Sequence, residues 1–86
     1  MARILAIDDE QSIAELIQES LAVCGHSVDT AVNGQQGLHL FETDHYDLVV
    51  TDMCLPDING DRILNHIRCS GRPSTPVVGI SGTPWR

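Results

Sequence analysis

Short aliphatic runs alternate along this chain with longer segments whose apolar residues recur at helical spacing. The runs occupy residues 3–7, 48–52 and 77–81, and residues 27–31 form one further short strand segment. Continuous Val, Ile and Leu runs of this length are typical of parallel strands that are covered on both faces. Three strand–helix units and a final strand follow in order. The pattern therefore predicts an α/β protein with a doubly wound parallel sheet.

The first predicted helix follows the strand at residues 3–7. Ser12 and Glu15 have the spacing of a capping box, which predicts the start of a helix at Ser12. Gly25 is expected to end the helix, because glycine readily adopts the left-handed conformation after a C-terminus. One apolar stripe is expected to face the core, formed by Ile13, Leu16, Ile17, Leu21 and Cys24.

The second predicted helix covers Gln35–Thr43 and is preceded by Asn33-Gly34. Leu38 and Phe41 are its expected core contacts. Gly37 lies inside it at a cost of up to about 1 kcal/mol relative to alanine, which weakens the helix prediction.

The third predicted helix begins at Asn59 or Gly60 and runs to about Cys69. This register places Ile63 and Ile67 on one face, toward the core.

Length and charge limit the classes of function. The chain has 86 residues, which is enough for one domain, residues 1–86. Its formal charge is −7, its pI is near 4.7, and it has no cluster of Lys or Arg. Binding of nucleic acid through a basic face is therefore not expected, because phosphate contacts supply most of that affinity. Without a leader segment or a membrane-length apolar run, we expect a cytoplasmic protein with no membrane contact.

Three cysteines are present, Cys24, Cys54 and Cys69, without CxxC spacing. Three reduced, partly buried thiols are the expected state, and a structural disulfide is the alternative.

Acidic residues follow two of the aliphatic runs. Asp8 and Asp9 come directly after the first run, and Asp52 ends the third. Ligands of parallel sheets bind beyond the carboxyl ends of the strands, so these three carboxylates should meet at one edge. At about 4 Å and an effective dielectric constant near 20, each like-charged pair costs roughly 4 kcal/mol. A hard divalent cation relieves that repulsion, which predicts a Mg²⁺ site, although residues 8 and 9 could simply be polar strand ends.

The ordered segments resemble the receiver domain of two-component response regulators from Met1 to about Thr83. The resemblance implies a flavodoxin-like fold with strand order 2-1-3-4, here incomplete with about four strands and three helices. It also implies that Asp8 and Asp9 are the metal pair and that Asp52 is the phosphoacceptor. A bound Mg²⁺, a sensor histidine kinase or phosphotransfer protein as partner, and a signalling rather than an enzymatic role are expected from the same resemblance.

Further site residues are implied by the resemblance alone. Cys54 lies where the family presents a backbone carbonyl to the metal, so the implied metal set is Asp8, Asp9, Asp52 and Cys54. Ser81, at the end of the fourth strand, lies where a hydroxyl contacts the phosphoryl group. Leu55 to Gly60 corresponds to the loop after the acceptor strand.

The resemblance also implies parts that this sequence lacks. The sequence ends shortly after the fourth strand, whereas the family has a fifth strand followed by a phosphate-binding lysine, and the 86 residues contain no lysine. We therefore expect impaired switching. Without a fifth strand, residues 77–80 form an unprotected edge, which predicts a homodimer with Trp85 buried between the chains. A swapped C-terminal segment and a monomeric fragment are the alternatives.

Three functions remain open from the sequence. Asp52 could accept a phosphoryl group as a carboxylate nucleophile, which is the receiver reading. A hydrolase of the haloacid-dehalogenase type would instead need Asp-x-Asp after its first strand, and Cys54 stands in place of the second acid here. The third candidate is a receiver-like interaction protein that works without phosphorylation, which the absence of lysine favours.

Overall fold

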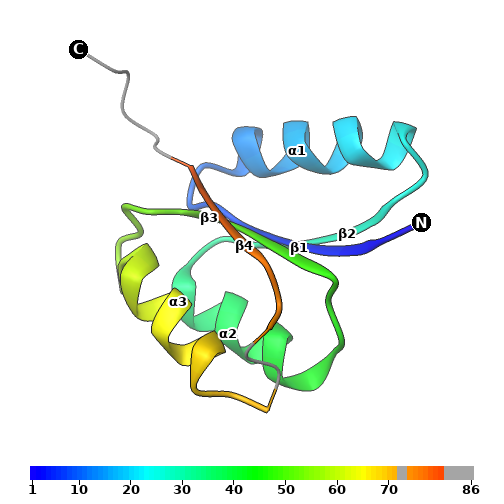
Figure 1. The fold of residues 1–86 in the computed structure, drawn as a ribbon. Coiled ribbons are helices and arrows are strands. Elements are labelled where there is room, and N and C mark those ends of the chain that lie inside the picture. Colours follow the sequence, from blue (N-terminus) through cyan, green and yellow to red (C-terminus); the bar gives the residue numbers. More distant parts are fainter. Residues whose placement is uncertain (72–73, 81–86) are drawn as a thin grey trace.

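A four-stranded parallel sheet organises the fold in the computed structural model, which describes residues 1–71 and 74–80 (Figure 1). The elements in chain order are β1 (Arg3–Ile7), α1 (Gln11–Val23), β2 (Ser27–Ala31), α2 (Gly34–Thr43), β3 (Leu48–Asp52), α3 (Gly60–Arg68) and β4 (Val77–Ile80). The strands lie in the order β2-β1-β3-β4, and all neighbouring pairs are parallel. The predicted α/β class and the strand order 2-1-3-4 are confirmed.

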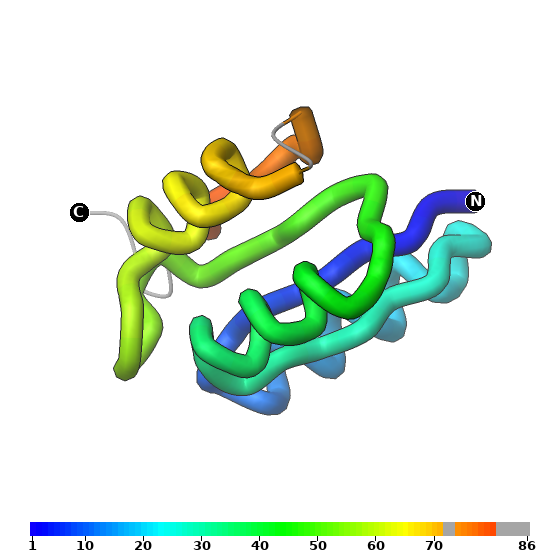
Figure 2. The backbone as a smooth tube through the Cα atoms, turned by 90° about the horizontal axis from the view of Figure 1, so that it is seen from below, coloured from blue at the N-terminus to red at the C-terminus, as the bar shows by residue number. Residues whose placement is uncertain are grey.

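The helices cover the two faces of the sheet unequally. Figure 1 shows α1 alone on one face and both α2 and α3 on the other. In Figure 2, seen from below, α2 and α3 cross in front of the strands while α1 lies behind them. The main core should therefore lie between the sheet and the α2–α3 layer. Within the described residues, no helix is both long and apolar enough to span a bilayer.

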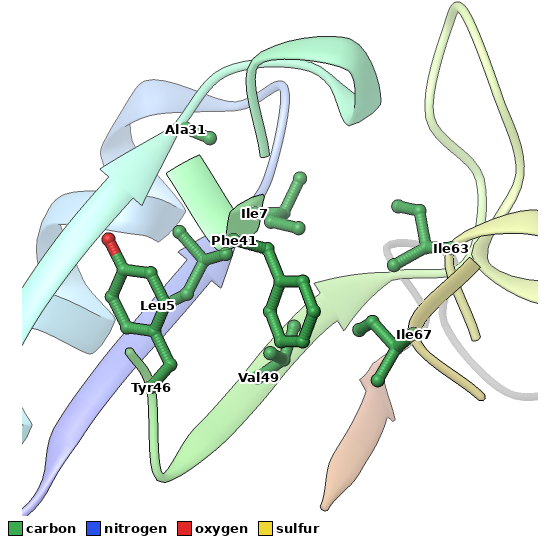
Figure 3. Packing of buried hydrophobic residues seen from close by; sticks show 8 residues of the cluster. All are labelled: Leu5, Ile7, Ala31, Phe41, Tyr46, Val49, Ile63 and Ile67. Carbon is green, nitrogen blue, oxygen red and sulfur yellow. The ribbon is translucent and has the colours of Figure 1, made fainter. Parts of the chain in front are cut away.

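Side chains from five elements and one loop form that main core (Figure 3). Its buried members are Leu5, Ile7, Ala31, Phe41, Tyr46, Val49, Ile63 and Ile67. Ile63 and Ile67 are fully buried, as the predicted register of α3 requires. Phe41 is 2% exposed and Leu38 packs against the same cluster, so both expected contacts of α2 are confirmed.

Close packing of α2 against β1 explains why residue 37, inside this helix, is a glycine. A Cβ atom at this position would lie 2.4 Å from Cδ1 of Ile7, far closer than van der Waals contact. The absent side chain lets α2 approach β1, and close packing offsets the low helix propensity of glycine.

The predicted start of α1 is wrong. The helix begins at Gln11, so Ser12 lies inside its first turn, and the N-cap residue is Glu10 with no side-chain capping bond. The spacing of Ser12 and Glu15 therefore makes no capping box. The chain enters this helix from the site edge of the sheet, where Asp8 rather than Ser12 bonds a backbone N–H of the turn.

The predicted apolar stripe of α1 is only partly correct. Ala14 is the one residue of the helix that is buried, and Ile17 and Leu21 pack against the smaller cluster of Ile4, Ala6 and Val28. Three members of the stripe are exposed: Ile13, Leu16 and Cys24. The physical reason is that α1 contacts β1 and β2 along one narrow side.

The end of α1 agrees with the prediction. Gly25 has a φ of 88°, and its N–H donates to the carbonyl of Ala22. The N–H of His26 donates to the carbonyl of Leu21, which completes a Schellman motif. The turn brings the chain back to start β2.

Candidate functional site

Three carboxylates meet at the carboxyl edge of the two central strands. Asp8 follows β1, Asp52 is the last residue of β3, and Asp9 extends from the turn into α1. Ligand oxygens of the three side chains lie within 4.8 Å of one another. Parallel pairing of β1 with β3 causes this convergence, because it places both strand ends at the same edge.

Backbone donors hold the two buried carboxylates. Asp8 is 3% exposed and Asp52 is 4% exposed, whereas Asp9 is open to solvent. The N–H of Glu10 donates to Oδ1 of Asp8 at 2.9 Å, and the N–H of Cys54 donates to Oδ1 of Asp52 at 3.0 Å. Within the described residues, Oδ2 of each carboxylate accepts no hydrogen bond. One oxygen of each side chain is thus fixed and the other is available.

The electrostatics of the cluster are unfavourable for the bare carboxylates. Burial raises the pKa of Asp8, the N–H of Glu10 opposes that shift, and the charges of Asp52 and Asp9 raise the pKa further. The pKa of Asp8 therefore lies above its ordinary value. A buried carboxylate with a raised pKa beside a like charge is typical of a functional site rather than of a stabilising ion pair.

The described cation nearest in sequence to these acids is engaged at the other end of the sheet. Arg3, at the amino end of β1, pairs with Asp29 at 3.3 Å and with Asp44 at 3.4 Å. Its guanidinium also lies 5.4 Å from the ring centre of Tyr46, whose hydroxyl donates to Asp29 at 2.7 Å. Asp29 and Asp44 thus have a cationic partner, whereas within residues 1–71 and 74–80 no ion pair involves Asp8, Asp9 or Asp52.

The acidic cluster fits a hexacoordinate magnesium ion. Oxygen ligands lie about 2.0–2.1 Å from Mg²⁺, so oxygens on one ion are at most about 4 Å apart. The ligand atoms here span up to 4.8 Å, and the exposed side chain of Asp9 is free to close the difference. Carboxylate oxygens are the donors that Mg²⁺ prefers in proteins.

The β3–α3 loop, residues 53–59, is packed closely behind the site. The N–H of Met53 donates to the carbonyl of Ile80, and the N–H of Gly60 donates to the carbonyl of Met53. A Cβ on Gly60 would lie 2.4 Å from Sδ of Met53, and one on Gly79 would lie 2.6 Å from the same atom. Both glycines thus make room for the methionine side chain beneath the loop.

Asp57 is a residue whose role the sequence analysis missed. Its carboxylate accepts hydrogen bonds from the N–H groups of Gly34 and Gln35, both at 2.8 Å, and from the N–H of Ile58 at 2.9 Å. The loop after β3 therefore bonds the first turn of α2. An acidic residue in a loop at the edge where the helix N-termini gather was the available signal.

The other predicted site residues are placed as follows. Cys54 presents its backbone N–H to Asp52 and exposes its thiol. Cys24 and Cys69 are likewise free and exposed, so the expectation of partly buried thiols is wrong: all three lie on helix ends or in the loop. Ser81 and Trp85 lie outside the described residues.

Comparisons with known proteins agree with this geometry. The family model described as "Response regulator receiver domain" matches residues 4–84. The transcriptional regulatory protein DltR of Streptococcus agalactiae is 45% identical over 79 residues, which cover 92% of this chain and 35% of DltR. The chain thus spans about a third of the length of this curated relative.

Solved structures show the same fold. The chemotaxis response regulator CheY4 of Vibrio cholerae has a TM-score of 0.92 and 26% identity, and the match covers 99% of this chain and 72% of CheY4. The response regulator TrrA of Thermotoga maritima, solved in complex with Mg²⁺–BeF, has a TM-score of 0.78 and 32% identity, and the match covers 96% of this chain and 90% of TrrA.

Proposed function

Because this chain belongs to the response regulator receiver domains, modules of two-component signalling, we propose that it accepts a phosphoryl group on Asp52. Asp8, Asp9, Asp52 and the backbone carbonyl of Cys54 are the proposed Mg²⁺ ligands. The observation that carries this proposal is the convergence of three carboxylates, two of them buried, at one edge of the sheet. The Mg²⁺–BeF complex of TrrA supports it.

The proposed reaction uses the two oxygens of Asp52 differently. Oδ1 is held by the N–H of Cys54, which leaves Oδ2 to attack the phosphorus of the donor. A bond forms between Oδ2 and phosphorus, the bond from phosphorus to the donor's leaving group breaks, and the leaving group takes the electron pair. Mg²⁺, when bound, neutralises charge on the transferring oxygens. Asp8 and Asp9 hold that ion and do not take part in bond formation.

Transfer is expected to be slow. The 86 residues contain no lysine, and loss of one positioned charge at a transferring group typically costs about 3 kcal/mol of barrier stabilisation. Ser81 is the proposed hydroxyl contact of the phosphoryl group. Asp52→Asn keeps the hydrogen bond from Cys54 and removes the nucleophile, so it is the matched control.

Intact mass spectrometry tests the proposal. The protein is incubated with a small acyl phosphate donor and Mg²⁺, and mass is followed with time. We expect gradual gain of one phosphoryl group, none in Asp52→Asn, and loss of the gain when Mg²⁺ is chelated. Equal modification of wild type and Asp52→Asn would contradict the acceptor. No modification of either would favour the phosphorylation-independent interaction protein.

A sensor histidine kinase or a phosphotransfer protein is the proposed partner. Family membership supports this choice, because receivers are the acceptors of two-component signalling. A cytoplasmic location belongs to the same proposal and is supported by the similarity to DltR, which is named as a regulator of transcription.

A homodimer through β4 is the second part of the proposal about partners. Among the described strands, β4 is at the edge of the sheet, and Val78 in it is 47% exposed. Backbone groups of such an edge are available to pair with a second copy. Sedimentation equilibrium at micromolar concentration should show a dimer, and Val78→Lys should convert it to monomer. Val23→Lys, on an 88% exposed residue of α1, should leave it dimeric. A monomeric wild type would contradict this part alone.

A further inference from the structure

The β3–α3 loop connects Asp52, the proposed phosphoacceptor, to both α2 and α3. At its start, the N–H of Cys54 holds Oδ1 of Asp52. Cys54 also forms an isolated antiparallel bridge with Asn59, the N-cap residue of α3. The side-chain oxygen of Asn59 accepts from the N–H of Arg62 at 3.0 Å. The orientation of the Asp52 carboxylate thus depends on where this loop lies.

Asp57 attaches the middle of the loop to α2. Its two carboxylate oxygens accept three N–H groups, from Gly34, Gln35 and Ile58, at 2.8, 2.8 and 2.9 Å. Asn33 caps the same helix through the N–H of Gln36 at 2.7 Å. The backbone N–H groups at the start of α2 thus donate to two residues. One is the local cap Asn33, and the other is Asp57, which lies 22 or 23 positions further along the chain than its donors.

Packing strengthens the same connection. A Cβ on Gly34 would lie 2.2 Å from Cγ1 of Ile58, so the glycine lets the loop lie directly on the first turn of α2. Beyond this contact the two helices separate around a groove of about 340 Å³, lined by Gln35, Leu38, Asp57, Ile58, Arg62 and His66. Further along, His66 and Glu42 join the helices again at 2.8 Å. Asp57 and Ile58 therefore provide the connection at the end nearest the site.

The charge state of Asp57 suits this role. Desolvation raises the pKa of its carboxyl group, but the N–H donors of Gln35, Gly34 and Ile58 outweigh it and hold the pKa below the ordinary value. The carboxylate is therefore ionised at neutral pH and favourably placed at the positive end of the α2 dipole.

We propose that Asp57 is a positioning residue for the site: by bonding the N-terminus of α2, it holds the loop whose Cys54 N–H orients Asp52. Among the described residues, the Asp57 carboxylate accepts hydrogen bonds from Gly34, Gln35 and Ile58 and from none of the proposed metal ligands. The expected effect on Mg²⁺ affinity rests on the proposed function. If Asp52 is a metal ligand, a poorly oriented Asp52 carboxylate should bind Mg²⁺ less tightly. Groups that orient metal ligands typically change affinity by about tenfold or more when they are removed.

Three variants separate positioning from simple helix capping. Asp57→Asn removes the charge with little change in shape, and Asp57→Ala removes the acceptor. Gly34→Ala keeps the carboxylate but forces Ile58 away from α2. Asp61→Asn is the control, since it removes an equal charge from the exposed first turn of α3. Each variant is measured for Mg²⁺ dissociation constant by calorimetry and for amide hydrogen exchange by NMR.

The expected result is that Asp57→Ala and Gly34→Ala weaken Mg²⁺ binding about tenfold and speed amide exchange at Cys54, while Asp61→Asn changes neither. Asp57→Asn should have a smaller effect in the same direction, and it decides the question if Asp57→Ala does not fold. Faster exchange at Gly34 and Gln35 alone, with wild-type exchange at Cys54, would overturn the inference and leave Asp57 as a cap of α2.

The proposed function can fail separately. If wild type binds no Mg²⁺, the metal proposal is contradicted, but amide exchange still tests the structural link from Asp57 to Asp52. In that case faster exchange at Cys54 in Asp57→Ala supports the link from Asp57 to Asp52, and unchanged exchange overturns it.

Discussion

Asp8 shows how a single residue can act against the stability of its own fold. Its carboxylate is 3% exposed, close to Asp52 and Asp9, and supported by one backbone donor. Acids elsewhere in the sheet, such as Asp29, have an arginine and a tyrosine hydroxyl as partners. Such a difference within one small fold supports the proposal that the acids at the carboxyl edge serve binding rather than stability.

We predict that Asp8→Asn stabilises the metal-free protein. Asparagine still accepts the N–H of Glu10, and it removes a buried charge that repels Asp52. At pH 7 the free energy of unfolding should rise by about 1 kcal/mol. The pKa of Asp8 in the folded state is raised above its ordinary value of 3.8. The ionised carboxylate therefore lowers the free energy of unfolding of wild type at pH values above this raised pKa. The gain should therefore disappear as pH falls below about 3.8, where wild type is protonated in both states.

Urea unfolding of both proteins across this pH range provides the measurement. Asp61→Asn, which removes an exposed charge from α3, should not stabilise at any pH. Destabilisation of Asp8→Asn at pH 7 would contradict the prediction, because it would mean that the ionised carboxylate stabilises the folded state.

At the scale of elements, helix starts decide where the chain can turn at the site edge. Asn33 caps α2 through its side chain, whereas Ser12 lies inside α1 and caps nothing. We therefore predict that Asn33→Ala costs about 1 kcal/mol of unfolding free energy. Ser12→Ala should be neutral or slightly stabilising, because alanine has the higher helix propensity. Thermal unfolding of both variants is the measurement. An equal loss of unfolding free energy in the two variants would indicate that Ser12 caps α1.

Contact between α2 and β1 leads to a second prediction at this scale. Gly37→Ala should destabilise by about 1–3 kcal/mol, although alanine favours a helix, because the new methyl group collides with Ile7. Ile7→Val removes the Cδ1 atom that is closest, so the double variant should recover part of the loss. Additive destabilisation in the double variant, measured by a thermodynamic cycle, would exclude this contact as the cause.

At the scale of the whole molecule, net charge affects the stability of the fold. The chain carries a formal charge of −7 with only five arginines and no lysine. Monovalent salt should therefore stabilise the fold by screening repulsion, with a Debye length near 10 Å at about 0.1 M. Mg²⁺ should do more, because the proposed site exists in the folded state only. At about ten times its dissociation constant, the gain is roughly 1.4 kcal/mol.

This comparison is made at equal ionic strength by thermal unfolding in NaCl and MgCl₂. We expect a higher melting temperature in MgCl₂ for wild type and equal melting temperatures for Asp9→Ala. Equal effects of the two salts on wild type would leave screening as the whole explanation and would contradict the metal site.

Much of this protein is determined by the sequence alone. Aliphatic runs, the stop at Gly25 and the helical spacing of Ile63 and Ile67 are local signals, because strand and helix periods are properties of neighbouring residues. The meeting of Asp8 with Asp52 also follows from sequence, since each ends a strand of a parallel sheet. These features required no knowledge of distances between elements.

Only the tertiary structure decided the features that depend on close approach. Exposure of Ile13 and Leu16 follows from how little of α1 the sheet covers. Gly37 is explained by Ile7 across the helix–sheet interface, and Asp57 by N–H groups more than twenty residues away in sequence. A hydrogen bond or a steric contact acts over a few ångströms in space, so its partner cannot be read from periodicity along the chain.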